Sequence, residues 1–262
     1  MSASCARLIL TRPQAQAEDW RARMAVHGVE CAVLPLIRIA PVPERVALAA
    51  AWQDLGACAL AFFVSPNAVE QFFSARPSGV VWPAATLAGT VGPGSAAALM
   101  RWGVPAEAIR QPPPDAASLD SEHLWPLLAP MDWAGRRVLM LRGDGGREWL
   151  ADRLREAGAE VAALSVYRRE PPQLDAAQQR LLDQALAQPA RHVWLFSSAE
   201  AIDHLARLGH PGRTGPVDWS RSLGIATHQR IAERARQLGL AHVVLTRPDA
   251  AAVAAAFHQL SG

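Results

Sequence analysis

The chain has 262 residues, half of them hydrophobic, and a formal net charge of +2 at neutral pH. This length and hydrophobic content are enough for two folded domains. The small net charge argues against a surface that binds nucleic acid or an anionic membrane. No apolar run is long enough to span a bilayer, and the N-terminus does not look like a signal peptide, so we expect a cytoplasmic protein.

Cysteine and histidine usage argues against a metal site. Cys5, Cys31 and Cys58 are far apart and form no C-x-x-C pair, which argues against a disulfide framework and fits a reducing compartment. The eight histidines show no metal-binding spacing. The phosphate-binding patterns G-x-x-x-x-G-K-[ST] and G-x-G-x-x-G are also missing, which argues against a nucleotide site.

Short apolar runs alternate with amphipathic helical stretches along the chain, the pattern of an α/β protein. We expect strands at residues 7–11, 31–39, 59–64, 87–91, 137–141, 161–167, 192–196, 222–226 and 242–245. Residues 148–156, between two of these strands, have the apolar spacing of a helix. Helix C-termini are expected at Gly28, Gly103, Gly158 and Gly239.

The chain repeats itself, and this predicts two similar lobes. The matching pairs of segments are 7–13 with 137–142, 28–30 with 158–160, 63–69 with 196–202, and 92–99 with 224–231. Two such lobes facing each other would form a cleft, where small-molecule sites usually occur. Residues 33–39 and 161–169 occupy equivalent positions in the two copies. Each is predicted to form a long strand that ends in charged residues and is followed by proline. They could pair as a linker between the lobes.

The sharpest local motif is Arg142-Gly-Asp-Gly-Gly-Arg147. It follows a predicted strand and opens a helix, so backbone N–H groups gather at a helix N-terminus and favour an anion. Its two guanidiniums could bind a carboxylate or phosphate through paired hydrogen bonds. The alternative is a tight turn with solvated arginines.

Hydroxyl side chains recur directly after strands, at Thr11, Ser65, Ser197, Ser198 and Thr227. The simplest interpretation is that they cap the following helices. Capped helix ends that face a cleft would also offer N–H donors to carboxylates, so the two interpretations are compatible.

Tyr167 is the only tyrosine in the chain and precedes Arg168 and Arg169. A tyrosine at the end of a strand is often there for packing. A phenol between two lobes and near cations is also a reasonable proton donor.

Taken together, these motifs resemble the uroporphyrinogen-III synthase family along the whole chain. The segments that carry the resemblance are 10–13, 34–36, 63–69, 91–96, 141–147, 166–168, 196–198 and 224–227. The family often has Thr at the position of Ser95, and Thr-Ser at the positions of Val64 and Ser65. Because of these departures, we expect the backbone N–H groups of Ser65 and Ser95 to matter more at the edge of the cleft than their side chains.

The resemblance implies two flavodoxin-like α/β lobes with parallel sheets, joined by a two-stranded linker in an interleaved topology. The first lobe would comprise residues 1–36 and 172–262, and the second residues 37–171. The linker strands would lie near residues 34–42 and 161–172. The repeat alone does not distinguish this arrangement from two consecutive domains.

The implied reaction cyclises hydroxymethylbilane, a linear tetrapyrrole with eight carboxylates, to uroporphyrinogen III with inversion of ring D and loss of water. The resemblance implies no metal or organic cofactor. Tyr167 matches the family tyrosine considered for assisting the departure of hydroxide, and the substrate's own carboxylates are the rival acid. A catalytically inactive two-lobed ligand-binding or regulatory protein is the alternative function on this fold.

The resemblance also implies which residues contact substrate. They are Arg12, Ser65, Asn67, Gly92, Ser95, Arg142, Gly143, Arg147, Ser197, Ser198 and Thr227. It further implies a monomer that makes transient contact with the preceding enzyme of the pathway and binds neither nucleic acid nor membrane.

Overall fold

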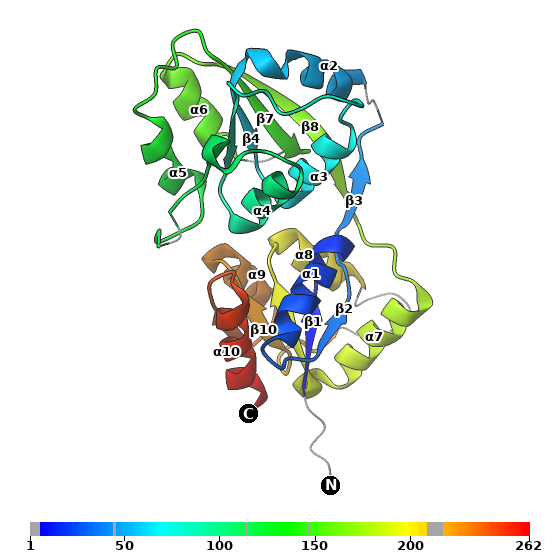
Figure 1. Cartoon of the computed structure of the whole chain (residues 1–262). Helices are drawn as coiled ribbons and strands as arrows, with labels where there is room; N and C mark the ends of the chain where they lie inside the picture. The colour runs from blue at the N-terminus through cyan, green and yellow to red at the C-terminus, as the bar shows by residue number, and fades with distance from the viewer. Residues whose placement is uncertain (1–5, 44–45, 114, 146, 209–216) are drawn as a thin grey trace. The chain divides into compact units, whose positions relative to one another are not determined.

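The computed structural model describes residues 6–43, 46–113, 115–145, 147–208 and 217–262 (Figure 1). The chain divides into two compact units, called here unit 1 (residues 1–38 and 170–262) and unit 2 (residues 39–169). Each unit is a mainly parallel sheet with helices on its faces, which confirms the predicted fold class. No helix in the described ranges is both long and apolar enough to cross a membrane.

Unit 1 contains a five-stranded parallel sheet in the order β11-β10-β9-β1-β2. Its strands are β1 (Arg7–Leu10), β2 (Cys31–Val33), β9 (His192–Phe196), β10 (Leu223–Ala226) and β11 (His242–Leu245). Its helices are α1 (Gln14–Ala25), α7 (Ala176–Ala187), the short η3 (Pro189–Arg191), α8 (Ala199–Leu208), α9 (Gln229–Leu238) and α10 (Ala250–Ser261). Trp20 and Met24 of α1 pack with Phe257 of α10 in one buried core.

Unit 2 contains a six-stranded sheet in the order β3-β8-β7-β4-β5-β6. Its strands are β3 (Arg38–Pro41), β4 (Cys58–Phe63), β5 (Leu87–Thr90), β6 (Ile109–Arg110), β7 (Arg137–Gly143) and β8 (Glu160–Glu170). Its helices are α2 (Val46–Asp54), η1 (Leu55–Ala57), α3 (Pro66–Ser74), α4 (Pro93–Arg101), η2 (Ala106–Ala108), α5 (Ser121–Leu128) and α6 (Trp149–Glu156). Residues of α2, α3 and α4 share one buried core, and residues of α5 and α6 share another.

The two sheets have the same layout but are assembled from different parts of the repeat. Counted along the chain, the strands of unit 1 have the order 2-1-3-4-5, which is flavodoxin-like. In unit 2, β7 and β8 take the first two positions, and β4, β5 and β6 take the other three. Apart from the additional edge strand β3 of unit 2, each sheet therefore combines the first two strands of one repeat copy with the last three of the other. This exchange is the interleaved topology.

The predicted strand at residues 31–39 is wrong in one respect, because it consists of two strands in different sheets. The residues between them are still tied to β1, since Leu34 donates to the Leu10 carbonyl at 3.0 Å and Leu36 donates to that of Thr11 at 3.1 Å. Pro35 has no N–H group and cannot continue a ladder. The chain passes between the units within β3 and β8, which are neighbours in the unit 2 sheet.

The predicted positions of the helix-ending glycines are confirmed. Gly28, Gly103, Gly158 and Gly239 all have positive φ, between 70° and 116°. Only glycine adopts this conformation without strain, so these residues end the helices cleanly. The two-residue strand β6 was not predicted, because it is too short to produce a pattern.

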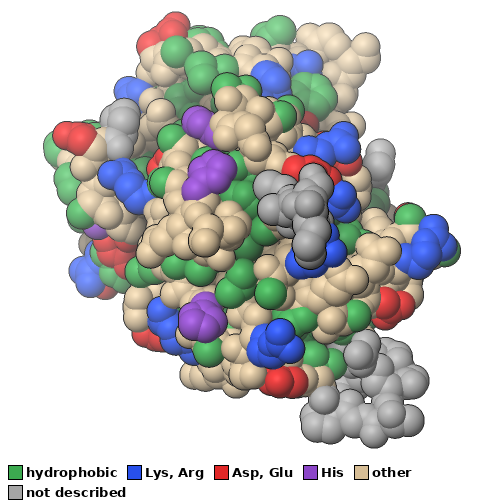
Figure 2. All heavy atoms as spheres, turned by 90° about the horizontal axis from the view of Figure 1, so that it is seen from below, with side chains coloured by type: hydrophobic (Ala, Val, Ile, Leu, Met, Phe, Trp, Pro, Cys, Tyr) green, Lys and Arg blue, Asp and Glu red, His purple; other side chains and the backbone are tan. Residues whose placement is uncertain are grey.

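Charged side chains of both signs lie on the face of the molecule drawn in Figure 2. Over the described part of the face drawn in Figure 2, arginines lie among acidic, histidine and hydrophobic side chains. This distribution agrees with the small net charge of the sequence.

We propose that each unit is a domain that folds by itself. Unit 2 has its own aromatic core, in which Trp52 stacks on Phe72 at a centroid distance of 4.5 Å and Phe73 stacks on Trp82 at 5.8 Å. We therefore expect a fragment of residues 39–169 to unfold cooperatively in urea, with a near-native circular dichroism spectrum. A fragment of residues 1–130 is the control, because it holds one repeat copy but no complete sheet. Stable folding of 1–130 together with a disordered 39–169 would refute the proposal.

Candidate substrate site

The candidate residues lie at the carboxyl edges of the two sheets. In α/β sheets with the order 2-1-3-4-5, ligands bind at this edge, where the strand order reverses. The reversal lies between β1 and β9 in unit 1 and between β7 and β4 in unit 2. The segments that follow these strands contain most of the predicted substrate contacts.

In unit 1, Arg12 follows β1, Ser197 and Ser198 lie between β9 and α8, and Thr227 follows β10. The capping role predicted for Thr227 is wrong, because His228 caps α9 by accepting from the Arg230 N–H at 3.2 Å. The Thr227 N–H instead donates to the Phe196 carbonyl at 3.2 Å. The helix begins one residue later than the sequence indicated, so the threonine belongs to the strand edge.

Thr11 does not cap a helix either. Its hydroxyl donates to the Leu195 carbonyl at 2.6 Å and so ties the end of β1 to β9. Pro13 occupies the N-cap position of α1 and makes no side-chain cap. The N-terminus of α1 is therefore not satisfied by a side chain of its own N-cap residue.

Arg12 is the most unusual cation of unit 1. Its guanidinium lies 4.6 Å from the centroid of the Trp20 ring, and its Nε is buried without a hydrogen-bond partner in the described chain. Burial and then the positive charge of Arg23 lower the pKa of Arg12 to about 10, against the opposite effect of Asp19. Arg12 is still charged at neutral pH. The side chain as a whole is partly exposed, and only its Nε is both buried and without a partner among the described residues. A buried donor without an acceptor is costly, so this position suits an anion.

In unit 2, the residues after β4 and β5 begin helices. Ser65 caps α3, because its Oγ accepts from the Ala68 N–H at 3.3 Å, which confirms the capping interpretation for this residue. Asn67 lies in the first turn of α3. Gly92 is the N-cap residue of α4, and Ser95 is buried in its first turn with its N–H donating to the Gly92 carbonyl at 3.0 Å.

Tyr167 lies near the carboxyl end of β8 and is fully buried, with 0% relative exposure. Its phenol oxygen is 3.0 Å from the Ser65 Oγ. Arg169 donates from Nη2 to the same oxygen at 3.4 Å, and its guanidinium lies 5.9 Å from the centroid of the ring. The sequence indicated cations near the phenol but gave no signal that Ser65, 102 residues away, would bond to it.

Gly143 makes room for the tyrosine ring. It is the partner of Tyr167 in the β7–β8 register, where the register shifts between Arg142 and Gly143. A Cβ atom on Gly143 would lie 2.7 Å from the ring carbon Cε2 of Tyr167. Gly143 is therefore required by close packing against the phenol, and no positive φ is involved.

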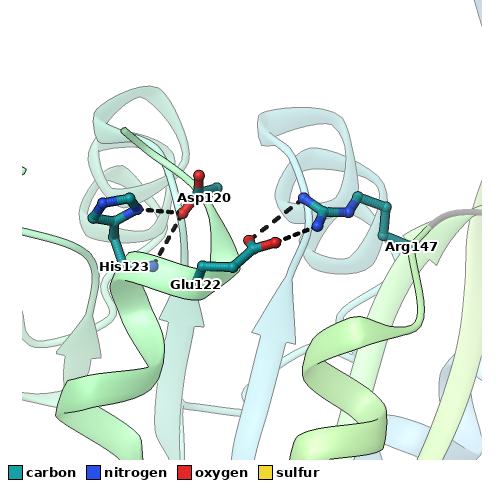
Figure 3. A network of polar contacts seen from close by, with 4 residues as sticks. All are labelled: Asp120, Glu122, His123 and Arg147. Atoms are coloured by element: carbon teal, nitrogen blue, oxygen red, sulfur yellow. Dashed lines mark hydrogen bonds and ion pairs between the residues drawn. The ribbon is translucent and has the colours of Figure 1, made fainter. Parts of the chain in front are cut away.

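The two arginines of the Arg142–Arg147 motif are held by ion pairs with carboxylates. Arg142 pairs with Glu148, and Arg147 pairs with Glu122 at the start of α5 (Figure 3). The hydrogen bond from Arg142 is the largest cause of the lowered pKa of Glu148, and the charges of Arg142 and Arg155 add to it. Neither of these two carboxylate partners was predicted from the sequence. Gly146, within the motif, lies outside the described residues.

The N-terminus of α5 that carries Glu122 is itself fixed by a cap. Asp120 accepts from the His123 N–H at 3.0 Å and contacts its ring Nδ1 at 2.6 Å (Figure 3). Burial alone would raise the pKa of Asp120, but hydrogen bonds from His123 and Ser118 keep it below its usual value. Among the described residues, no group of three or more His, Cys, Asp or Glu side chains is placed to hold a metal ion.

These features define a two-unit α/β protein of the doubly wound type, with a buried phenol and arginine side chains at the carboxyl edges of its sheets. The sequence profile of the family described as uroporphyrinogen-III synthase HemD matches residues 18–255. The chain belongs to the uroporphyrinogen-III synthase family, and it is a cyclising lyase of tetrapyrrole biosynthesis.

Individual relatives agree with this assignment. The chain is 31% identical to the uroporphyrinogen-III synthase of Escherichia coli K12 over 241 residues, which cover 88% of this chain and 91% of the relative. It is 29% identical to that of Chlorobaculum parvum over 177 residues, covering 65% and 67%. A solved structure of the Helicobacter pylori enzyme has a TM-score of 0.57 at 15% identity, with 97% of each chain covered. A mutant enzyme of Thermus thermophilus has a TM-score of 0.56 at 18% identity, with 98% of each chain covered. These two structures support the fold.

The close packing at Gly143 gives a direct test of the site geometry. Gly143→Ala should push the Tyr167 ring out of place and lower the free energy of unfolding by about 1–3 kcal/mol, as overpacking does. The matched control is Gly94→Ala in α4, whose added Cβ would make only an ordinary 3.6 Å contact with Pro66. Urea unfolding of both variants measures the difference, and equal stability of the two would show that the ring is not held against Gly143.

Proposed function

We propose that this chain converts hydroxymethylbilane to uroporphyrinogen III with Tyr167 as the source of the proton that assists departure of the hydroxyl group. Family membership supports a tetrapyrrole substrate. The observation that carries the residue assignment is the phenol of Tyr167, which is hydrogen-bonded to Ser65 at the carboxyl edge of unit 2. No observation favours the inactive ligand-binding alternative.

The reaction is mainly a problem of orientation. Without an enzyme, the linear tetrapyrrole closes its ring without inverting ring D. To obtain the inverted product, the enzyme must favour attack by the substituted position of ring D, through a spiro intermediate. Correct positioning of reacting groups can supply about 7–11 kcal/mol of a barrier. The substrate's carboxylates are the natural handles for such positioning.

The two sheet edges supply groups that suit carboxylates. In unit 1 these are Arg12 with its unpartnered Nε and the segments before α8 and α9. In unit 2 they are Arg142, Arg147 and the N-termini of α3 and α4. Hydrogen bonds to charged groups contribute about 1.5–3 kcal/mol each, so a few of them can fix the conformation of the substrate. Substrate carboxylates would share or replace Glu148 and Glu122 as partners of Arg142 and Arg147.

We propose further that the enzyme acts as a monomer in the cytoplasm and contacts the preceding enzyme of the pathway only transiently. The free, separated thiols of Cys31 and Cys58 are in keeping with a reducing compartment. Sedimentation equilibrium with and without the preceding enzyme measures the oligomeric state and the contact.

The product of the reaction tests the function. Purified protein incubated with hydroxymethylbilane should give the type III isomer, and Tyr167→Phe should slow turnover by about 10²–10⁴-fold, the usual contribution of general acid catalysis. Because the uncatalysed route stays open, its product should drift towards the type I isomer. A Phe variant with normal turnover and pure type III product would assign the acid to the substrate's own carboxylates.

Arg147→Ala tests anion recognition in unit 2. It should raise KM and make the remaining affinity less sensitive to salt, because one screened charge interaction is lost. Arg101→Ala is the matched control, since Arg101 also forms an exposed ion pair, with Glu70 at 2.9 Å, but on α4 away from the motif. Equal KM values and salt responses of the two variants would mean that Arg147 is a structural residue only.

Arg12→Met tests the buried cation of unit 1. The substitution removes a partly exposed charge whose Nε is buried without a partner in the described part of the chain, so the free energy of unfolding should stay constant or rise by about 1 kcal/mol, even though the contact with Trp20 is weakened. Substrate affinity should fall at the same time. Thermal unfolding and KM measure the two effects. A variant that is clearly destabilised, with unchanged KM, would show that Arg12 serves the fold.

A further inference from the structure

We propose that Ser65 is a catalytic residue that passes the proton to the departing hydroxyl group, and that Tyr167 replaces this proton from behind. This inference rests on the proposed function, since it concerns the route of the same proton. Three observations support it: the burial of Tyr167, the pattern of donors around its oxygen, and the position of Ser65 at the start of α3.

Burial decides which hydroxyl a substrate can reach. Tyr167 is fully enclosed: its ring packs against Gly143 and belongs to the core that also contains Phe63 and Val166. Ser65 is only partly buried and lies at the carboxyl edge, where the predicted substrate contacts gather. A phenol without exposed surface cannot touch the leaving oxygen, but the hydroxyl bonded to it can.

The donors around the pair fix the direction of their hydrogen bond. A guanidinium only donates, so the Arg169 bond leaves the phenolic proton of Tyr167 to be donated elsewhere. In the described chain, the only acceptor in contact with it is the Ser65 Oγ at 3.0 Å. If Ser65 donated instead, the buried phenolic proton would have no acceptor, at a cost of about 1–3 kcal/mol. We therefore take Tyr167 as the donor.

With Tyr167 as donor, the Ser65 hydroxyl proton points away from the pair. Its oxygen already accepts two bonds, from Tyr167 and from the Ala68 N–H at 3.3 Å. The hydroxyl has two acceptor positions and one proton, so the proton is left for a partner at the edge of the sheet. The capping hydrogen bond from the Ala68 N–H therefore fixes the orientation of the Ser65 hydroxyl and also stabilises the N-terminus of α3.

The proton transfer balances. As the substrate C–O bond breaks, its electron pair stays on the oxygen, which takes the Ser65 proton and leaves as water. The phenolic proton moves to the Ser65 Oγ, and a phenolate remains beside the Arg169 guanidinium. The substrate becomes a cation at the former hydroxymethyl carbon. Attack by the substituted position of ring D, which carries no hydrogen, forms the spiro intermediate without loss of a ring-carbon proton. The former bond from this position to the neighbouring ring then breaks. The new C–C bond at the unsubstituted position of ring D releases its hydrogen as the proton that returns through Ser65 to the phenolate.

Three substitutions of Ser65 distinguish its proposed role in proton transfer, called here the relay, from its role as the N-cap residue of α3. Ser65→Thr keeps the hydroxyl and should retain turnover within about tenfold. Ser65→Asn keeps a capping acceptor but has no hydroxyl, so kcat should fall by about 10²–10⁴-fold at similar stability. Ser65→Ala should lose the same activity and also some stability. Ser74→Ala, at the other end of α3 with its hydroxyl on the Gln71 carbonyl at 3.0 Å, is the control that should change neither.

Two kinetic measurements distinguish a relay from a structural role. The value of kcat is measured in mixtures of light and heavy water and plotted against the deuterium fraction. For the native enzyme the plot should be curved, because two protons are transferred in the same step. For Tyr167→Phe the plot should be linear, because only one proton is transferred. The double variant Ser65→Asn with Tyr167→Phe should be no slower than the slower single variant, because both residues serve one step.

The outcomes separate the two proposals. If Tyr167→Phe is slow but Ser65→Asn turns over normally, the relay is wrong and Tyr167 acts by itself. Additive losses in the double variant would also overturn the relay. If both variants give type III product at the native rate, the role of Tyr167 in the proposed function is wrong as well.

Discussion

The hydrogen bond between the Tyr167 phenol and the Ser65 hydroxyl is the contact on which the candidate site of unit 2 depends. It joins the end of β8 to the start of α3, two elements that are far apart in the sequence. Gly143 supplies the space for the ring, and Arg169 supplies the charge beside it. Fold and chemistry are therefore coupled: the packing that buries the phenol also determines which hydroxyl can meet a substrate.

The arginines that we propose as anion-binding groups lie in different environments in the two units. Arg142 and Arg147 are already paired with Glu148 and Glu122, so a substrate carboxylate would share or replace these partners. Exposed ion pairs of this kind contribute little to stability, so their replacement costs little free energy. Arg12 is the opposite case, because burial lowers its pKa and its Nε has no partner in the described chain. A bound carboxylate would offset this cost, which is why we propose Arg12 as a substrate contact.

The sequence predicted much of this structure, for identifiable reasons. The repeat predicted two similar sheets, and the glycines marked the ends of helices, because both signals are local. The candidate residues after strands do lie at the carboxyl edges of the sheets, since parallel strands bring their carboxyl ends to one edge. The break at Pro35 was missed because apolar residues continue across it. The Ser65–Tyr167 bond and the Glu122–Arg147 pair were missed because they join residues 102 and 25 positions apart. The interleaving could not come from the repeat alone, since similar copies do not show whose strands pair.

The central claim, that Ser65 holds the phenol of Tyr167, can be measured directly because the chain contains a single tyrosine. Protein labelled with ¹³C at the tyrosine Cζ should give one NMR signal from that ring. The account predicts that Ser65→Ala shifts this signal by removing the hydrogen-bond partner, whereas Ser74→Ala leaves it in place. A signal that does not move in the Ser65→Ala variant would contradict the account.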